Sequence, residues 1–342
     1  MAWTINNGKL YFNSKLYTGN GGTNVVTGVG FNSDFTWIKN RATTGNHALF
    51  DKINGVTKYL NSNNQNGLAT SAPTLTAWSS DGFTIGSSTD LNGNGNGIAS
   101  WNWLANGAGS ANTDGDINST VSANTTSGFS IVTYTGTGSN ATIGHGLGAA
   151  PSMIIVKDLS EDNYDWMVYH QSLGATKYIR LNLTSAVSTS TVWQDTAPTN
   201  QVFSVVSNSS DVNKSGNNFI AYCFANVQGF SKMGSYVGNG STNGTFIYTG
   251  FRPAFAMFKD TTSARDWTML DNKRNTFNVM DKRLFPNNSD AENDTDILDF
   301  TSNGIKLRST NTSVNVSGNT YIYMAFAENP ITSSTGVPST AR

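Results

Sequence analysis

The chain has 342 residues and a formal net charge of −1 at pH 7, and only 13% of its residues are charged. A nucleic-acid-binding surface and a surface that binds an anionic membrane both need clustered lysines and arginines, so the sequence predicts neither nucleic acid nor membrane as a partner. Cys223 is the single cysteine, which excludes a disulfide within the chain and a cysteine metal site.

Short apolar runs alternate with turns rich in glycine and asparagine from the beginning of the chain. Residues 35–39 and 98–103 are examples, and each interleaves aromatic or apolar residues with polar ones. A period of two between such turns is typical of antiparallel β-strands. Helical periodicity over about 11 residues is not found in any segment. We therefore expect an all-β protein built from antiparallel sandwiches or jelly-roll-like units.

Residues 108–126 consist mostly of glycine, serine, asparagine, threonine and aspartate. This composition is typical of a flexible linker, so we expect residues 1–107 to pack as a body separate from the rest of the chain. No comparable stretch divides residues 127–227 from residues 228–330, which predicts close packing between these two parts. The tail, residues 331–342, is rich in serine and threonine and is expected to be flexible.

A repeated phrase divides the chain into the three predicted units 1–107, 127–227 and 228–330. A strand that ends in a tyrosine, a glycine-rich turn and a second strand that ends in a lysine occur in each unit, and the spacing agrees once the linker is allowed for. The recurring positions are Tyr17, Tyr134 and Tyr236, and Lys39, Lys157 and Lys259. The first unit reads Asn94-Gly95-Asn96-Gly97 where the others read Asn-x-Ser-Gly-Asn, and we expect it to have diverged for attachment.

The recurring lysines and two tryptophans are the candidate contact residues. Lys39, Lys157 and Lys259 share one position, which suggests a common ligand or subunit contact; the alternative is a solvated strand end with a local ion pair. Trp78 and Trp193 are candidates for stacking on sugar rings if they are exposed, and core residues if they are not.

Two acidic loops are candidates for calcium, which prefers six to eight oxygen ligands. Neither loop has the spacing of an EF-hand, so the alternative is a solvated loop. The candidate ligands are Asp158, Glu161 and Asp162 in the first loop and Asp290, Asp294 and Asp296 in the second. No other cofactor is indicated.

No catalytic residues are predicted, and we do not expect an enzyme. His47, His145 and His170 lack the spacing of a metal site or a catalytic pair, and no Gly-x-Ser-x-Gly elbow occurs. Acidic residues are sparse, so no pair of opposed carboxylates of the kind that glycosidases use stands out.

Several phrases resemble virion proteins of tailed bacteriophages from marine metagenomes, a repeat-containing, tail-fibre-like and largely uncharacterised β-domain family. These phrases cover residues 112–136, 145–148 with Pro151, Lys157, Trp166 and His170, 234–240, 249–253 and 270–274. The resemblance implies a virion structural protein with β-sandwich units, and it carries no catalytic residues to transfer.

The sequence therefore leads to the expectation of an exterior virion protein, a fibre, adhesin or decoration protein, made in the cytoplasm of a bacterial host. Its expected partners are other virion proteins, further copies of itself and glycans of the host surface, where repeated weak sites gain avidity. The alternatives are an array of carbohydrate-binding modules, a decoration protein with no receptor role and, third, a glycan depolymerase.

Overall fold

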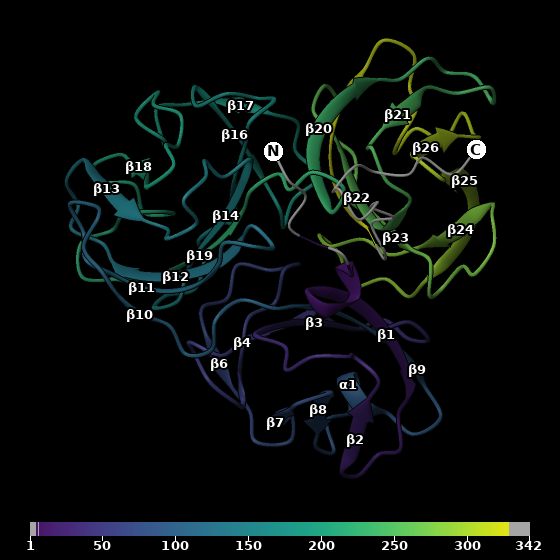
Figure 1. Cartoon of the computed structure of the whole chain (residues 1–342), viewed down its shortest axis with the longest axis horizontal. Helices are drawn as coiled ribbons and strands as arrows, with labels where there is room; N and C mark the ends of the chain where they lie inside the picture. The colour runs from purple at the N-terminus through teal and green to yellow at the C-terminus, as the bar shows by residue number, and fades with distance from the viewer. Residues whose placement is uncertain (1–4, 6, 328–342) are drawn as a thin grey trace.

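The all-β class predicted from the sequence is confirmed. The computed structural model describes residue 5 and residues 7–327. Helix in this part of the chain is confined to a 3-10 turn, η1 (Gly8–Leu10), and a single α-helical turn, α1 (Thr89–Asn92). The remaining regular structure is antiparallel β-sheet, arranged as three lobes around a common centre (Figure 1). We refer to the lobes as unit one (residues 8–107), unit two (108–227) and unit three (228–327).

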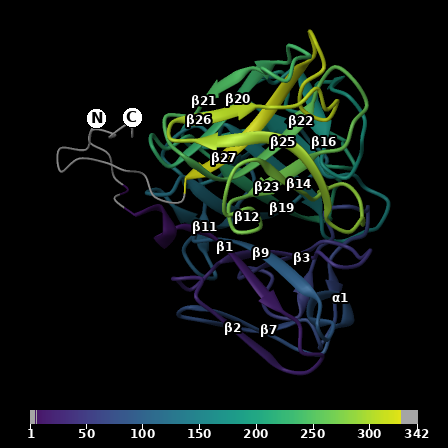
Figure 2. The same cartoon turned by 90° about the vertical axis from the view of Figure 1, so that its right-hand side faces the viewer.

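Unit one is the lower lobe of Figure 1. A four-stranded sheet, in the order β1-β9-β3-β4, faces the other units, and a three-stranded sheet, β2-β8-β7, lies farthest from them (Figure 2). Its strands are β1 (Phe12–Thr18), β2 (Asn24–Thr27), β3 (Phe35–Asn40), β4 (Ala48–Asp51), β5 (Lys58–Tyr59), β6 (Ala69–Thr70), β7 (Leu75–Ser79), β8 (Gly82–Ile85) and β9 (Gly97–Trp103).

Unit two contains an eight-stranded sheet in the order β10-β11-β12-β19-β14-β15-β16-β17, opposed by the pair β13-β18. Its strands are β10 (Ser110–Asn112), β11 (Ser119–Asn124), β12 (Phe129–Thr135), β13 (Ala141–Gly144), β14 (Met153–Asp158), β15 (Met167–His170), β16 (Lys177–Arg180), β17 (Ser188–Thr189), β18 (Val202–Val205) and β19 (Asn218–Phe224).

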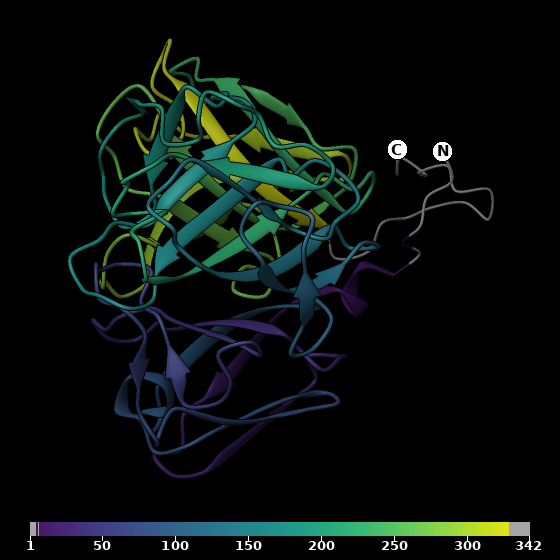
Figure 3. The same ribbon diagram turned by 90° about the vertical axis from the view of Figure 1, so that its left-hand side faces the viewer.

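Unit three pairs two four-stranded sheets, β20-β27-β22-β23 and β21-β26-β25-β24. Figure 3 shows units two and three together above unit one. The strands are β20 (Ser231–Val237), β21 (Phe246–Tyr248), β22 (Pro253–Asp260), β23 (Thr268–Asp271), β24 (Met280–Arg283), β25 (Asn293–Thr301), β26 (Gly304–Leu307) and β27 (Thr320–Ala327).

The expectation of a flexible linker at residues 108–126 is wrong, because this segment supplies β10 and β11. Every residue of β11 pairs with β12, from Ser119 opposite Tyr134 to Asn124 opposite Phe129. The backbone of an edge strand offers a full row of hydrogen-bonding groups whatever the side chains are. A segment rich in serine and threonine therefore becomes part of the sheet.

The same strand order recurs in the sheet that each unit turns toward the centre. Four strands of this sheet, counted in chain order, recur: the first pairs with the fourth, the fourth with the second, and the second with the third. The three sets are β1-β9-β3-β4, β12-β19-β14-β15 and β20-β27-β22-β23. We call these the inner sheets. Opposite each inner sheet lies a second sheet with the same number of strands or fewer, which we call the outer sheet. A separate apolar cluster fills the space between the two sheets of each unit.

A further apolar cluster draws residues from all three inner sheets and fills the centre of the molecule. Trp103, Phe224 and Phe326 lie at the ends of the last strands β9, β19 and β27, and their rings form a triangle. The ring centroids are 6.3 Å apart between Trp103 and Phe224, 6.0 Å between Phe224 and Phe326, and 5.8 Å between Trp103 and Phe326. Each ring therefore contacts both of the others, and the three units share one core.

One set of hydrogen bonds closes the turn that follows β1, β12 and β20, the first of the four recurring strands in each unit. The recurring tyrosine donates to the backbone carbonyl just before a buried asparagine, and that asparagine accepts from the turn. The tyrosine bonds are Tyr17 to Leu91 O at 2.7 Å, Tyr134 to Val212 O at 2.6 Å and Tyr236 to Val314 O at 2.8 Å. The asparagine bonds are Asn20 N to Asn92, Thr137 N to Asn213 and Asn239 N to Asn315, at 3.0, 2.9 and 2.9 Å.

The expected divergence of unit one at this turn is wrong. Asn92, two residues earlier than Asn94, takes the place of Asn213 and Asn315. Gly95 has a φ of +78°, beside +84° and +81° for the corresponding glycines of units two and three, a region that favours glycine. Its amide donates to Gly19 O at 2.9 Å, as the corresponding glycines do. The motif is intact in unit one and begins two residues earlier than the sequence comparison predicted.

Polar side chains also join each unit to the next at a recurring position of the third inner strand. The pairs are Tyr222 Oη to Asp51 at 3.2 Å, Trp101 Nε1 to Asp271 at 3.0 Å, and His170 Nε2 to Tyr323 O at 3.3 Å. Unit one thus contacts unit two, unit two contacts unit three, and unit three contacts unit one. The contacts form a closed cycle.

The histidine in this cycle has a physical explanation. Met324 occupies the position in β27 that Trp101 and Tyr222 occupy in β9 and β19, and a methionine has no hydrogen to donate. An aspartate at position 170 would face Met324 and would receive no hydrogen bond from its side chain. The imidazole of His170 instead donates to a backbone carbonyl, and burial lowers its pKa to about 4, so it is neutral at pH 7.

We predict that His170→Asp lowers the free energy of unfolding by about 3 kcal/mol at pH 7, because it buries a carboxylate against a carbonyl oxygen. The loss shrinks at pH 5, where a protonated carboxyl can donate. Urea unfolding at both pH values measures this. His170→Asn, which keeps a neutral donor, is the control and costs about 1 kcal/mol. Equal losses for the two variants at pH 7 would contradict the explanation.

Candidate functional site: a polar groove between units one and two

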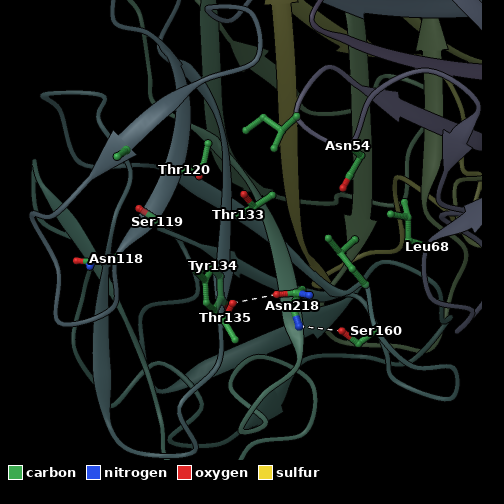
Figure 4. Close-up of a pocket in the computed structure, with 13 residues that line it drawn as sticks. Asn54, Leu68, Asn118, Ser119, Thr120, Thr133, Tyr134, Thr135, Ser160 and Asn218 are labelled. Carbon is green, nitrogen blue, oxygen red and sulfur yellow. Dashed lines mark hydrogen bonds between the residues drawn. The ribbon is translucent and has the colours of Figure 1, made fainter.

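A groove of about 710 Å³ lies where unit one meets the inner sheet of unit two (Figure 4). The figure shows Thr133, Thr135 and Asn218 on one side and Asn54 and Leu68 on the other. The lining residues are Ile53, Asn54, Leu68, Ala111, Asn118, Ser119, Thr120, Thr133, Tyr134, Thr135, Leu159, Ser160 and Asn218.

The floor of the groove lies on the face of β12 that also contributes to the central core. The first half of the strand packs into the core, and the second half lies under the groove. Along β12, Phe129 and Ile131 point into the shared central cluster. Side chains alternate between the two faces of a strand, so Thr133 and Thr135 continue the same face beyond that core. The change from apolar to hydroxyl residues on one face therefore marks where the central core ends and the groove begins.

The strands β10 and β11 extend this floor sideways. Thr120 in β11 lies opposite Thr133, and Ser119 lies opposite Tyr134. Neither unit one nor unit three carries a strand on the corresponding edge of its inner sheet within the described residues. One side of the groove is therefore built by strands that have no counterpart in the described parts of units one and three, and they come from the segment whose composition suggested a linker.

Backbone and side-chain hydrogen bonds hold the far wall in place. Leu68 N of unit one donates to Leu159 O at 2.9 Å, and Leu159 N donates to Asn218 O at 2.8 Å. The side chains of Thr135 and Asn218 share a bond of 2.9 Å, and Ser160 Oγ accepts from Asn218 N at 2.8 Å. Residues from both units thus have fixed positions around the groove.

The chemistry of the lining is neutral. Tyr134 is the one titratable residue among the thirteen that line it. Its hydroxyl is bonded to Val212 O on the other side of the sheet, and burial raises its pKa. What faces the groove is a set of hydroxyls, amides and a few aliphatic side chains, which suits a ligand that both donates and accepts hydrogen bonds and carries no charge.

Comparison with protein families gives a match over most of the chain. Residues 7–330 match the domain of unknown function DUF7483. The chain belongs to the DUF7483 family. Comparison with curated proteins finds no relative. No helix in the described part of this DUF7483 chain is long and apolar enough to cross a membrane.

The recurring lysines of this DUF7483 chain are buried and contact the neighbouring unit. Each ammonium binds backbone carbonyl oxygens on both sides of a unit boundary. These contacts also form a closed cycle, but each lysine contacts the neighbouring unit that Asp51, His170 or Asp271 of its own unit does not. The bonds across the boundary are Lys39 Nζ to Ser289 O at 3.2 Å, Lys157 Nζ to Gln65 O at 3.3 Å and Lys259 Nζ to Thr184 O at 2.9 Å.

Burial lowers the pKa of all three lysines to about 8, against the opposing effect of nearby carboxylates. The alternative of a solvated strand end is therefore wrong. An external ligand has no access to these ammonium groups, because their side chains are fully buried. They join units within one chain.

The carboxylates named as calcium candidates do not converge. Within residues 5 and 7–327, no group of three or more acidic, histidine or cysteine side chains is placed to hold a metal ion. Asp158 is buried and accepts from Ser160 N and Asn217 Nδ2 at 2.7 Å each. Glu161 pairs with Lys214 at 2.6 Å.

The other acidic candidates also have separate surroundings. Asp162 accepts from Gly67 N at 2.8 Å, across the boundary with unit one, and Asp294 pairs with Lys282 at 3.0 Å. Asp162 and Asp290 lie among the carboxylates that favour the charged forms of Lys157 and Lys39. Asp296 is exposed on β25. These carboxylates therefore lie at unit boundaries and at the surface, and Asp294 and Asp296 belong to strand β25 and not to a loop.

The two tryptophans proposed for sugar stacking are not exposed platforms. Trp193 is 2% exposed and packs edge-on against Tyr169, with ring centroids 6.1 Å apart. Trp78 is half-buried against the core of unit one and points its indole nitrogen at Thr36 Oγ1, 3.5 Å away. Trp193 is therefore a core residue, as the alternative predicted. Most of the surface of Trp78 is buried against the core of unit one as well.

The residues that do line the groove were not among those singled out from the sequence. One signal was available: Thr133 and Thr135 follow Phe129 and Ile131 at alternate positions, so a polar face continues an apolar one. The opposite wall comes from Asn54 and Leu68, which precede Thr133 by 79 and 65 residues, and nothing local in the sequence connects them.

We predict that the unfolding free energy of the wild type rises relative to Lys157→Met as the pH is raised from 8 to 10.5. Below pH 8 the ammonium of Lys157 is charged in both the folded and the unfolded chain, and its burial lowers the stability of the folded chain. Above 10.5 the amine is neutral in both states and the penalty is gone, which amounts to a change of about 2–3 kcal/mol.

Urea unfolding at the two pH values measures this difference. Both chains carry the same tyrosines and cysteine, so the other groups that titrate at high pH cancel. A difference between wild type and variant that does not change with pH would show that the lysine keeps its ordinary pKa in the folded state.

Proposed function

We propose that this protein is an exterior structural and adhesive component of a tailed-phage virion, made in the cytoplasm of a bacterial host. In this proposal it binds an uncharged glycan of the host surface in the groove between units one and two, and it works by binding and not by catalysis. Other virion proteins and further copies of the chain are its proposed structural partners. The resemblance of its sequence phrases to virion proteins motivates the location.

The groove is the observation that carries the binding part of the proposal. Its lining is rich in hydroxyl and amide groups, which match the alternating donors and acceptors of a sugar, and its walls are fixed by bonds between two units. Thr135 and Asn218 are exposed and bonded to one another, so their remaining donor and acceptor capacity faces solvent. A ligand here meets preorganised groups, which reduces the entropy lost on binding.

A second candidate, a decoration protein that docks on other virion subunits, is favoured by a different surface. Val237, Phe246 and Tyr248 of unit three are 53%, 45% and 55% exposed. Thr245 Oγ1 donates to Val237 O at 2.7 Å, which places the end of β20 beside the start of β21. Exposed apolar side chains that gather at a sheet edge are typical of protein contact sites.

We predict that Asn218→Ala weakens binding of a glycan by about tenfold, a loss of about 1.4 kcal/mol, because it removes one amide from the groove. An array of bacterial surface glycans identifies the ligand, and titration of the purified protein measures the change. Thr27→Ala, an exposed strand threonine of unit one, is the matched control and leaves affinity unchanged. Equal affinity of wild type and Asn218→Ala would exclude the groove as the site.

Immunogold labelling of intact phage with antibody against the purified protein tests the location. Gold on fibres or the tail tip is the result expected of an adhesin. Gold distributed uniformly over the head favours the decoration role over the adhesive one. A particle preparation that carries no gold would contradict the virion assignment and would favour an array of carbohydrate-binding modules outside phage biology.

A further inference from the structure

A second cavity, of about 340 Å³, lies within unit one, away from the groove. Pockets that bind small molecules begin at about 300 Å³, so it has room for one small ring. Strand β5, the loop before β7 and the region of α1 surround it. Its lining residues are Asn46, Ala48, Tyr59, Asn61, Ser71, Pro73, Thr74, Ser87, Ser88, Thr89, Asp90 and Leu91.

An aromatic ring forms part of the wall. Tyr59 is half-buried, and the ring of Phe50 supports it at a centroid distance of 5.7 Å. A ring that is packed against the core on one side and lines a cavity is held in a fixed orientation. It offers a flat apolar surface at little further cost in side-chain entropy.

The corresponding ring in unit two is covered. The sequence Lys58-Tyr59-Leu60-Asn61 of unit one corresponds to Lys177-Tyr178-Ile179-Arg180 of unit two. The guanidinium of Arg180 lies 5.0 Å from the ring centroid of Tyr178 and donates to its hydroxyl at 3.0 Å.

In unit one this cover is missing because the residue that would supply it is short. Asn61 stands at the position of Arg180, and its amide donates to His47 O at 2.6 Å. Among the described residues no cation lies over the ring of Tyr59. The replacement of one long side chain by a short one thus leaves a ring beside an open cavity.

The cavity also has an acceptor and a donor with capacity to spare. Asp90 is exposed, and its carboxylate accepts no hydrogen bond from the described part of the chain. The oxygen of Asn46 accepts from Asn63 at 2.7 Å, which leaves the NH₂ group of Asn46 free to donate. Ser87 and Ser88 add hydroxyls of either role.

We propose that this cavity binds a single uncharged hexose ring. The C–H face of the sugar lies on Tyr59, two neighbouring hydroxyls donate to the carboxylate of Asp90, and a further sugar oxygen accepts from Asn46. A carboxylate at the rim selects against anionic sugars by charge repulsion. The site requires neither the groove nor the virion location, so it goes beyond the proposed function.

The test uses the purified full-length chain and a panel of methyl glycosides of glucose, galactose, mannose and N-acetylglucosamine. Saturation-transfer NMR identifies a bound sugar and the protons that face the protein, and calorimetric titration measures its affinity. We expect at least one glycoside to bind at millimolar concentration or better, with transfer strongest to the protons of one ring face.

Tyr59→Ala and Asp90→Asn are each expected to weaken this binding at least tenfold. Asp90→Asn changes an exposed side chain, so it tests the site even if Tyr59→Ala fails to fold. Tyr178→Ala, at the covered counterpart ring, is the matched control and leaves affinity unchanged.

Three results would overturn the inference. They are binding of no sugar in the panel, full affinity in Asp90→Asn, and preferential binding of an amine such as choline with no sugar bound. A sugar that is lost in Asn218→Ala and kept in Asp90→Asn would lie in the groove, so the proposed function would stand while this site would not.

Discussion

The structure depends on the contact among three aromatic rings at its centre. Trp103, Phe224 and Phe326 lie at or next to the end of the last strand of each inner sheet, and each ring touches the other two. A sandwich of about 100 residues that keeps one sheet turned to solvent has little core of its own. Here the second face of every inner sheet is buried by the other units, so a chain with 37% hydrophobic residues still forms continuous apolar packing.

Burial on this scale forces polar groups to find partners across unit boundaries, and the two cycles of polar contacts are the result. The lysines reach carbonyl oxygens of one neighbouring unit, while Asp51, His170 and Asp271 contact the other. Each unit is thus joined to both of its neighbours by short, directional bonds in addition to apolar packing. Such bonds fix the rotation of one unit against the next, which apolar packing alone leaves less well defined. The groove lies at one of these boundaries, so its geometry depends on the same contacts.

Much of the fold follows from local sequence, and most of the site does not. The period-two runs and the turns around Tyr17, Tyr134 and Tyr236 predicted antiparallel strands, because side-chain alternation and glycine conformation are local properties. The composition of residues 119–124 does not predict a strand, because their pairing comes from the backbone of β12 and not from their own side chains. The burial of Lys157 was beyond prediction, since its carbonyl partner, Gln65 O, lies 92 positions away in the sequence. The walls of the groove are separated in the same way.

The closure of the ring of units has a consequence for how the chain is made. A ribosome releases unit one first, yet Trp103 and the inner face of β9 receive their final neighbour only when Phe326 has been synthesised. Until then the nascent protein exposes the aromatic inner face of this sheet. Interactions of such long sequence separation form late and slowly. The strands β10 and β11 are made early and cover one edge of the inner sheet of unit two, which suits a chain that must stay unaggregated while it waits for its C-terminal third.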